Sequence, residues 1–225
     1  MFLKLYTAWL GLFSVSFLFL PIYLVLDWRK RGTAEGFSSV VLIIPGIIQS
    51  FWLRHAWMNN DWSNVLINSL NLTFLSFYIA VYAYYQPRRK YLIGQLIGAA
   101  FIVQCAFYYV DAHDPEDMSA AMGTVAAGAQ ILGLGGRIYE IRRAIKMGTT
   151  EYIPAVMQFA VATLMAQWFI FGVVTGNKFI AIANIAGLLT SAFTMYLYFR
   201  YPPLTWTVPI FNIPPQQSTK SEKKE

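Results

Sequence analysis

Long apolar runs, separated by charged or polar connectors, dominate the pattern of this chain. Each run has about 20 residues, the length that an α-helix needs to cross the hydrocarbon of a bilayer. The runs occupy residues 5–26, 38–58, 64–85, 91–110, 118–136, 153–174 and 179–201. The fifth is built from Ala and Gly, and small residues suit a helix that packs closely against its neighbours. The pattern therefore predicts an all-α membrane protein with seven transmembrane helices.

Composition narrows the classes of function. Of the 225 residues, 57% are apolar and 12% are charged, against about 45–50% and about 25% in soluble domains. Seven crossings leave only short connectors, so we expect no soluble catalytic domain and no enzyme. Cys105 is the only cysteine, which excludes an internal disulfide and a thiolate metal cluster. We expect no metal and no cofactor.

The positive charges indicate the orientation. Lys and Arg number 17 against 11 Asp and Glu, and they gather in alternate connectors and the tail, at Arg29, Lys30, Arg31, Arg88, Arg89, Lys90, Arg142, Arg143, Lys146, Arg200, Lys220, Lys223 and Lys224. Basic connectors of membrane proteins lie in the cytoplasm, so this excess does not indicate nucleic acid binding. We expect the N-terminus outside, the C-terminus inside, and a disordered cytoplasmic tail over residues 204–225.

The two halves of the chain repeat each other at an offset of 116 residues without a gap. The matched pairs include Lys30 and Lys146, Gly32 and Gly148, Thr33 and Thr149, Glu35 and Glu151, Trp52 and Trp168, Asn68 and Asn184, Tyr85 and Tyr201, and Pro87 and Pro203. Matched polar residues are not expected from chance overlap of apolar runs. We therefore predict one three-helix repeat at residues 1–87 and a second at 118–203. A linker helix with its connectors, at 88–117, gives both repeats the same orientation.

These residues resemble the SWEET sugar facilitators, in an animal or nematode form. The resemblance covers residues 5–203 and depends on Pro21, the connector motifs at 32–37 and 148–154, the two Trp and Asn pairs, and the run 181–184. SWEET proteins are among the transporters built from parallel repeats. The resemblance implies two three-helix bundles, a cofactor-free uniport of mono- or disaccharides, and homo-oligomers or hetero-oligomers with paralogues.

The candidate binding residues lie at matching depths in the two repeats. At about 1.5 Å per residue, Trp52 lies about 9 Å from the outer end of its helix and Asn68 about 8 Å. Trp168 and Asn184 repeat this arrangement. A sugar presents an apolar C–H face that packs on an indole, and hydroxyls that an Asn amide matches as donor and acceptor. We expect these four residues, with Ser50, to line one cavity for a neutral sugar.

Each residue type has another common role. Trp near a membrane interface serves as an aromatic anchor, and Asn in a membrane helix can join helices through hydrogen bonds. The Trp and Asn assignments therefore stay open at this point.

Prolines inside helices are candidate hinges, because each removes a hydrogen bond and permits a kink. Pro21, Pro45 and Pro154 qualify, and the resemblance places family hinge prolines in these helices. The position in the fifth helix that corresponds to Pro21 is Arg137, preceded by Gly133, Gly135 and Gly136, which can supply the flexibility. Arg137 can act in gating, extend its charge to the interface, or pair with Glu140 one turn away.

The outer side departs from the family pattern. Asp61 in the first repeat corresponds to Asn177 in the second, where the family commonly carries Asp, so we expect a different outer-gate contact. The family's Tyr after the first Trp is replaced by Leu53, which cannot hydrogen-bond and can shift sugar preference.

Passive transport is the mechanism that the charges favour, because the acidic residues, Glu140 included, fall at connectors or helix ends rather than deep in the membrane. Two alternatives remain: a PQ-loop-type carrier or cargo receptor for an amino acid or peptide, and a seven-helix signalling receptor. The first calls for charged cavity residues, and the internal repeat argues against the second. We expect the lipid bilayer of the plasma membrane as the location, with the Golgi or another internal membrane as an alternative.

Overall fold

The computed structural model describes residues 2–216, in which helices account for all of the regular structure except an isolated bridge between Val208 and Ile213. The helices are α1 (Phe2–Phe17), α2 (Ile22–Arg31), α3 (Val40–Met58), α4 (Trp62–Tyr85), α5 (Arg89–Asp111), α6 (Met118–Gly133), α7 (Gly135–Met147), α8 (Ala155–Val174) and α9 (Lys178–Arg200). They form seven segments long and apolar enough to cross a membrane, because α1 and α2 share the first segment and α6 and α7 the fifth. The predicted all-α fold with seven spans is confirmed.

The first and fifth spans are longer than predicted and are interrupted. The first span ends at Arg31, five residues beyond its predicted end at 26. The fifth ends at Met147, eleven residues beyond its predicted end at 136. Both end at a glycine in the left-handed region, Gly32 with φ +71° and Gly148 with φ +64°. A left-handed glycine ends a helix by satisfying its last carbonyl groups, and the cations before it interact favourably with the helix C-terminus. The basic residues that the sequence assigns to the connectors after the first and fifth spans therefore lie in α2 and α7.

The interruptions lie at related positions of the two repeats. The first span is broken at residues 18–21, where Pro21 precedes α2. The fifth is broken at Leu134, between Gly133 and Gly135. Pro21 and Leu134 have nearly the same backbone angles, φ −69° and ψ −4° against φ −70° and ψ −8°. A proline at one break and flanking glycines at the other accompany a similar local conformation.

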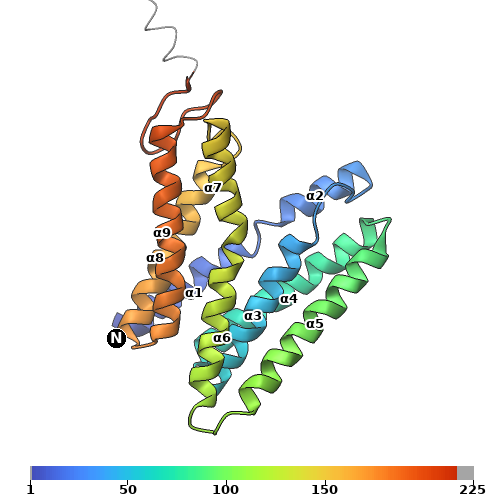
Figure 1. The fold of residues 1–225 in the computed structure, drawn as a ribbon, viewed down its shortest axis with the longest axis vertical. Coiled ribbons are helices and arrows are strands. Elements are labelled where there is room, and N and C mark those ends of the chain that lie inside the picture. The colour runs from blue at the N-terminus through green and yellow to red at the C-terminus, as the bar shows by residue number, and fades with distance from the viewer. Residues whose placement is uncertain (1, 217–225) are drawn as a thin grey trace, which may run out of the picture. The chain divides into compact units, whose positions relative to one another are not determined.

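The first of two compact units runs from Met1 to Gly133. In it α4 packs against α1, α2 and α3, while α3 also packs against α5 and α6 (Figure 1). Two groups of side chains form its core. One surrounds Trp28, Tyr78 and Tyr82, and the other surrounds Phe51 and Met122. The first half of the fifth span thus belongs to the first unit by its contacts.

The second unit runs from Leu134 to Glu225. Its α8 and α9 lie side by side and α7 also packs against α9 (Figure 1). Residues 201–216 come after α9 and return over the connector between α7 and α8, where Val208 is fully buried. The sequence assigns all of 204–225 to a disordered tail, whereas 204–216 pack here because Trp206, Val208 and Ile213 supply apolar contacts. Lys220, Lys223 and Lys224 lie outside the described residues. The division at 87, 117 and 203 remains a prediction.

The repeat is reproduced in the hydrogen bonds that shape each connector. In the first repeat the Ala34 amide donates to Tyr85 O (3.0 Å), the Glu35 amide to Thr33 Oγ1 (3.1 Å) and the Tyr82 hydroxyl to Phe37 O (3.0 Å). In the second, the Thr150 amide donates to Tyr201 O (3.0 Å), the Glu151 amide to Thr149 Oγ1 (3.2 Å) and the Tyr198 hydroxyl to Ile153 O (2.9 Å). Donors and acceptors correspond at the offset of 116 residues, so the repeated polar residues have repeated structural roles.

Candidate functional site

The two matched Asn residues are buried within their own units. Asn68 on α4 is 7% exposed and Asn184 on α9 is 6% exposed. Each Nδ2 donates to the main-chain oxygen four residues earlier, Asn64 O and Ile180 O, both at 2.8 Å. These bonds stay inside one helix, and no other described residue hydrogen-bonds to either amide. The two Asn side chains therefore do not join helices in the described structure, and each amide oxygen keeps its acceptor capacity.

The two matched Trp residues have different surroundings. Trp52 on α3 is half-buried, and its Nε1 donates to Gln130 Oε1 on α6 at 2.7 Å. Its ring meets that of His55 edge to face, with centroids 5.7 Å apart. Trp168 on α8 is also half-buried and meets Phe171 edge to face at 5.5 Å. Trp52 is thus fixed by the first half of the fifth span, which the sequence repeat did not predict.

Ser50 lies half-buried on α3, two residues before Trp52, and its hydroxyl donates to Gly46 O of the same helix at 2.8 Å. Gly46 follows Pro45, which lies inside α3. Ser50 therefore stands in the same helix as the interior proline and Trp52. The structure places Ser50, Trp52 and Asn68 in one unit and Trp168 and Asn184 in the other, so their convergence on one cavity stays a prediction.

Of the three prolines predicted inside helices, only Pro154 lies outside one. Pro45 is inside α3, Pro21 lies inside the first span at the break between α1 and α2, and Pro154 immediately precedes α8. Pro154 has φ −66° and an extended ψ of 113°. Proline has no amide hydrogen to contribute, and the first amides of a helix have no partner within it, so proline is favoured at this position. Pro154 thus stands at a helix start, whereas Pro21 accompanies the break inside the first span.

Arg137 lies in the first turn of α7 and is half-buried. Its guanidinium donates to Ser191 Oγ on α9 at 3.2 Å. Glu140 is close enough to Arg137 to interact with it electrostatically. The two residues do not form one of the ion pairs found among the described residues. The prediction of Glu140 at a helix end or connector is wrong, because α7 continues for seven residues beyond it, to Met147. Arg137 joins two helices of the second unit, a role that its position alone did not indicate.

Asp61 and Asn177 begin the third span of each repeat. The Asp61 carboxylate accepts from the Asn64 amide at 3.2 Å, and the Asn177 side chain accepts from the Ile180 amide at 3.2 Å. Both are N-caps, for which Asp and Asn are equally suited. Asp61 also accepts from Asn64 Nδ2 at 2.6 Å. Helix capping thus accounts for both residue types, and a role in an outer gate remains a prediction.

Two residues that touch the candidate site were not identified from the sequence. Gln130 and Ser191 bond to Trp52 and Arg137 from helices distant in sequence. The only signal for either is that it is polar within an apolar span. Among residues 2–216 no group of three or more His, Cys, Asp or Glu lies close enough to hold a metal ion.

Residues 7–90 and 120–205 match the model of a family described as sugar efflux transporters for intercellular exchange. Among curated relatives, the bidirectional sugar transporter SWEET12 of rice (Oryza sativa subsp. japonica) is 25% identical over 177 residues, which are 76% of this chain and 59% of that protein. The sugar transporter SWEET1 of Drosophila pseudoobscura pseudoobscura is 24% identical over 183 residues, 80% of each chain. The chain thus spans less than two thirds of the rice protein.

A solved structure of a eukaryotic SWEET transporter superposes with a TM-score of 0.76. The match covers 89% of this chain and 99% of that one, at 18% sequence identity. At this identity the likeness concerns the fold. Together with the match of the family model over both halves of the chain, it places the candidate residues in a scaffold of known type.

Proposed function

We propose, from the premise that the chain belongs to the SWEET family of sugar transporters, that it carries mono- or disaccharides in both directions by passive uniport. The observation that supports this proposal most directly is the pair of buried Asn residues. Asn68 and Asn184 occupy matched positions, and each bonds only to its own helix among the described residues. An amide oxygen that accepts no hydrogen bond from the protein is available to a hydroxyl of the cargo.

The proposed cavity combines these amides with the two indoles. Trp52 and Trp168 offer apolar faces to the C–H face of a sugar ring, while Asn68 and Asn184 bond to its hydroxyls. Ser50 adds a hydroxyl on the helix of Trp52. The proposed lining is uncharged, which favours a neutral ligand over an amino acid or a charged peptide.

Transport without ion coupling is the second part of the proposal. Coupled carriers commonly hold a carboxylate deep in the membrane. Here Glu35, Asp61 and Glu151 lie outside the helices, and Asp27 lies in α2 one turn before its end, where it pairs with Arg31. Glu140 is the exception, since it lies inside α7. It therefore needs a direct test for proton coupling.

Alternating access is the third part. We expect the two repeats to rock about the bound sugar, as in other repeat-built carriers. The helix break at 18–21, the break at Leu134, and the prolines Pro45 and Pro154 are the proposed flexible points. Arg137, which bonds to Ser191 beside the second break, is proposed to stabilise one of the two states. Asp61 and Asn177 mark the proposed outer side.

The proposed setting is the plasma membrane, with the Golgi as the alternative, the N-terminus outside and the C-terminus in the cytoplasm. The orientation follows from the basic ends of α2 and α7. A homo-oligomer, or a hetero-oligomer with paralogues, is proposed from the family alone.

Uptake of radiolabelled glucose and sucrose into liposomes that contain the purified protein tests the proposal. We expect downhill flux in both directions that does not change with an imposed pH gradient. Asn68→Ala and Asn184→Ala should each lower flux about fivefold or more, because loss of one buried hydrogen-bond partner costs about 1–3 kcal/mol. Asn71→Ala is the matched control, since Asn71 lies on α4 one turn from Asn68, and it should keep most of the flux.

Three results would contradict different parts of the proposal. Equal flux in the parent and both Asn variants would exclude the site but leave sugar transport intact. Flux that follows the pH gradient in the parent but not in Glu140→Gln would replace uniport by proton coupling through Glu140. An absence of flux with every neutral sugar tested, from protein that elutes as a folded species, would reject the proposed cargo.

A further inference from the structure

A large open cavity lies in the first unit at the turn between α4 and α5. Its volume is about 1160 Å³, which exceeds the usual range for a small-molecule pocket of about 300–1,000 Å³. The residues that line it come from the end of α2, the end of α4 and the start of α5, and they are Gly32, Thr33, Tyr84, Tyr85, Gln86, Pro87, Arg88, Arg89, Lys90, Tyr91 and Ile93. All of them lie at the ends of membrane-spanning helices. The cavity is therefore placed where a membrane meets water.

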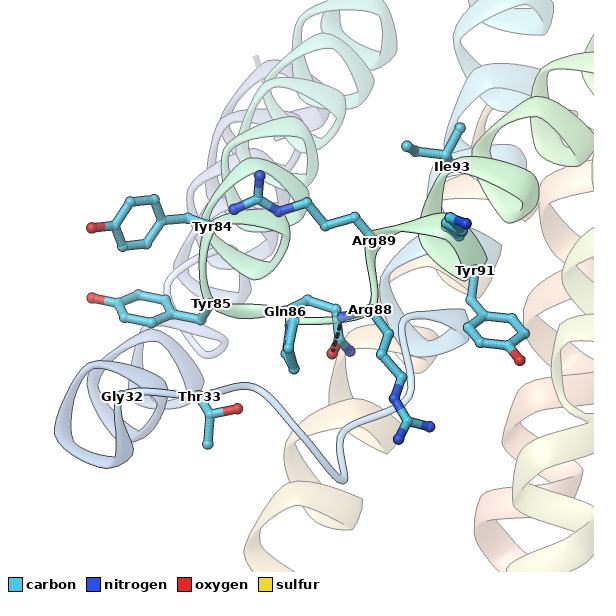
Figure 2. Close-up of a pocket in the computed structure, with 11 residues that line it drawn as sticks. Gly32, Thr33, Tyr84, Tyr85, Gln86, Arg88, Arg89, Tyr91 and Ile93 are labelled. Carbon is cyan, nitrogen blue, oxygen red and sulfur yellow. Dashed lines mark hydrogen bonds between the residues drawn. The ribbon is translucent and has the colours of Figure 1, made fainter.

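Three consecutive cations dominate this lining. Arg88, Arg89 and Lys90 are exposed, and the lining includes no acidic residue. The described part of the chain contains two ion pairs, Arg31 with Asp27 and Arg54 with Asp111, and neither involves these cations. Figure 2 shows the Arg88 and Arg89 side chains extending in different directions from the turn. Among residues 2–216 these cations have no ion-pair partner, and both long Arg side chains can turn toward an anion.

The backbone at this turn adds to the positive potential. Helix α5 begins at Arg89 and has no side-chain N-cap bond. The Arg88 amide donates a long bond of 3.4 Å to Gln86 Oε1, which Figure 2 draws as a dashed line. The first amides of a helix have no partner within it and carry the positive end of its dipole. The start of α5 therefore favours the same anion as the three side chains.

The second repeat fills the corresponding place with an anion of its own. Arg88 and Arg89 correspond to Leu204 and Thr205, whose amides donate to the Glu151 carboxylate at 2.6 and 3.1 Å. The Glu35 side chain, the counterpart of Glu151, is exposed and forms no such bond in the described structure. In the second repeat this turn binds a carboxylate, and in the first it binds none. Three cations occupy the positions in the first repeat that correspond to Leu204, Thr205 and Trp206.

We propose that this cavity binds the phosphorylated headgroup of an anionic phospholipid, of the phosphoinositide type, from the membrane around the protein. Three adjacent cations suit a headgroup with more than one phosphate, because Arg forms bidentate bonds to phosphate oxygens. Tyr84 and Tyr91 are 74% and 75% exposed at the helix ends, as aromatic residues at a headgroup layer are. Ile93 is 54% exposed one turn into α5, where it is available to contact the acyl chains of a bound lipid.

Lipid is favoured over a free phosphate compound because the cavity is open and rimmed by exposed apolar and aromatic side chains. A soluble ligand would leave these side chains in contact with lipid or water, whereas a phospholipid covers them with its own chains. The proposal depends on the membrane-spanning fold and is independent of the sugar cargo.

Native mass spectrometry and fluorescence titration of the full-length protein in nanodiscs test this proposal. The probes are phosphatidylcholine discs with and without phosphatidylinositol 4,5-bisphosphate, and the soluble headgroup inositol 1,4,5-trisphosphate as competitor. We expect binding of the phosphoinositide to fall at least tenfold in R88Q/R89Q/K90Q. The matched control is R142Q/R143Q/K146Q, which removes three exposed cations from α7 of the second unit and should change binding less than twofold.

Each other outcome decides against the proposal. An equal loss of phosphoinositide binding in both triple variants would mean that the lipid is attracted to positive charge in general. No loss of binding in R88Q/R89Q/K90Q would exclude the cavity as the binding site. Complete competition by inositol trisphosphate at the lipid's own concentration would identify a soluble phosphate ligand instead. If the triple variant does not fold, R89Q alone should lower affinity about threefold or more. R88K/R89K, which keeps both charges but loses the bidentate geometry of Arg, should lower affinity less than R88Q/R89Q does.

Discussion

The connector between α2 and α3 and the connector between α7 and α8 are held by the same set of hydrogen bonds, but different segments follow them in space. In each repeat a left-handed glycine ends a helix, a Thr hydroxyl shapes the turn, and a buried Tyr hydroxyl bonds across the connector. In the second repeat residues 201–216 pack against the connector, and Glu151 accepts hydrogen bonds from Leu204 and Thr205. In the first, the chain continues into α5 and leaves the cavity lined by Arg88, Arg89 and Lys90 open. The segment that follows the third span of each repeat thus decides whether the space beside the connector is filled or open.

The packing of the second and third spans differs as well. In the second repeat Gly172 lies so close to α9 that an added Cβ would be 2.6 Å from the Ala181 amide nitrogen. The corresponding residue of the first repeat is Ala56, which already has a Cβ and is 4% exposed. The repeats therefore share a topology but differ in how closely their second and third spans approach each other.

The largest expected effect is on this close approach. Gly172→Ala should lower the free energy of unfolding by about 1–3 kcal/mol, because the new Cβ meets backbone that a rotamer change cannot move. The reverse change, Ala56→Gly, should cost about 0.5–1 kcal/mol through backbone entropy and up to about 0.8 kcal/mol more through loss of the buried methyl group. Unfolding of both variants in detergent, monitored by circular dichroism, measures the difference. If Gly172→Ala is as stable as the parent, α8 and α9 leave room for a Cβ at 172, and the two helix pairs are packed alike.

A smaller, local effect is expected at the second connector end. The Thr205 hydroxyl, which donates to the Glu151 carboxylate, lowers the pKa of Glu151; partial desolvation opposes this, and the Leu204 and Thr205 amides lower it further. Because the pKa is lower in the folded chain, the stabilisation is complete above the ordinary value of 4.5 and is lost as the pH falls through the lowered pKa. Residues 201–216 should therefore loosen in acid.

Hydrogen exchange of the Leu204 and Thr205 amides measures this loosening. Glu151→Gln should increase their exchange roughly tenfold at neutral pH, as local opening of a surface segment does. Glu35→Gln is the matched control and should change no amide of its connector, since its side chain has no described partner. If the protection of both amides survives in Glu151→Gln, the apolar contacts of Trp206 and Val208 hold the segment without the carboxylate.

The smallest expected effect concerns the two N-caps. Asn177→Asp should stabilise the protein by about 0.3–1 kcal/mol, because a negative charge at the start of α9 interacts favourably with the helix dipole. Asp61→Asn should cost more than this gain, since Asp61 also holds Asn64 Nδ2, whereas the counterpart of Asn64 is Ile180. Thermal unfolding at low ionic strength compares the two. If the stability gained by Asn177→Asp equals the stability lost by Asp61→Asn, the hydrogen bond from Asn64 Nδ2 to Asp61 contributes nothing to the stability of the protein.

Much of the fold was predictable because the relevant signals are local. Hydropathy over about 20 residues identified every span, although α2 and α7 extend past the apolar runs through basic residues that glycines 32 and 148 terminate. Hydropathy does not detect such an extension, because a helix can continue into water once it is nucleated. Pro154 was misplaced for a related reason, since sequence pattern alone does not separate a helix start from a helix interior.

The candidate site was predicted only in part. The matched Trp and Asn residues were identified from the repeat, and the structure buries both Asn side chains. Their polar neighbours were not, because Trp52 with Gln130 and Arg137 with Ser191 are 78 and 54 residues apart. The offset of 116 predicts equivalence between positions and not contact between them.

The sequence by itself determined the seven spans, their repeat and the residue types at turns and caps, because hydropathy and short-range hydrogen bonds depend on neighbouring residues. Only the tertiary structure decided that 204–216 fill one connector end while Arg88, Arg89 and Lys90 surround an open cavity at the other. That difference depends on the direction the chain takes after each third span. Direction is set by long-range packing, here Val208 and Trp206 against the second unit's core, which no local pattern specifies.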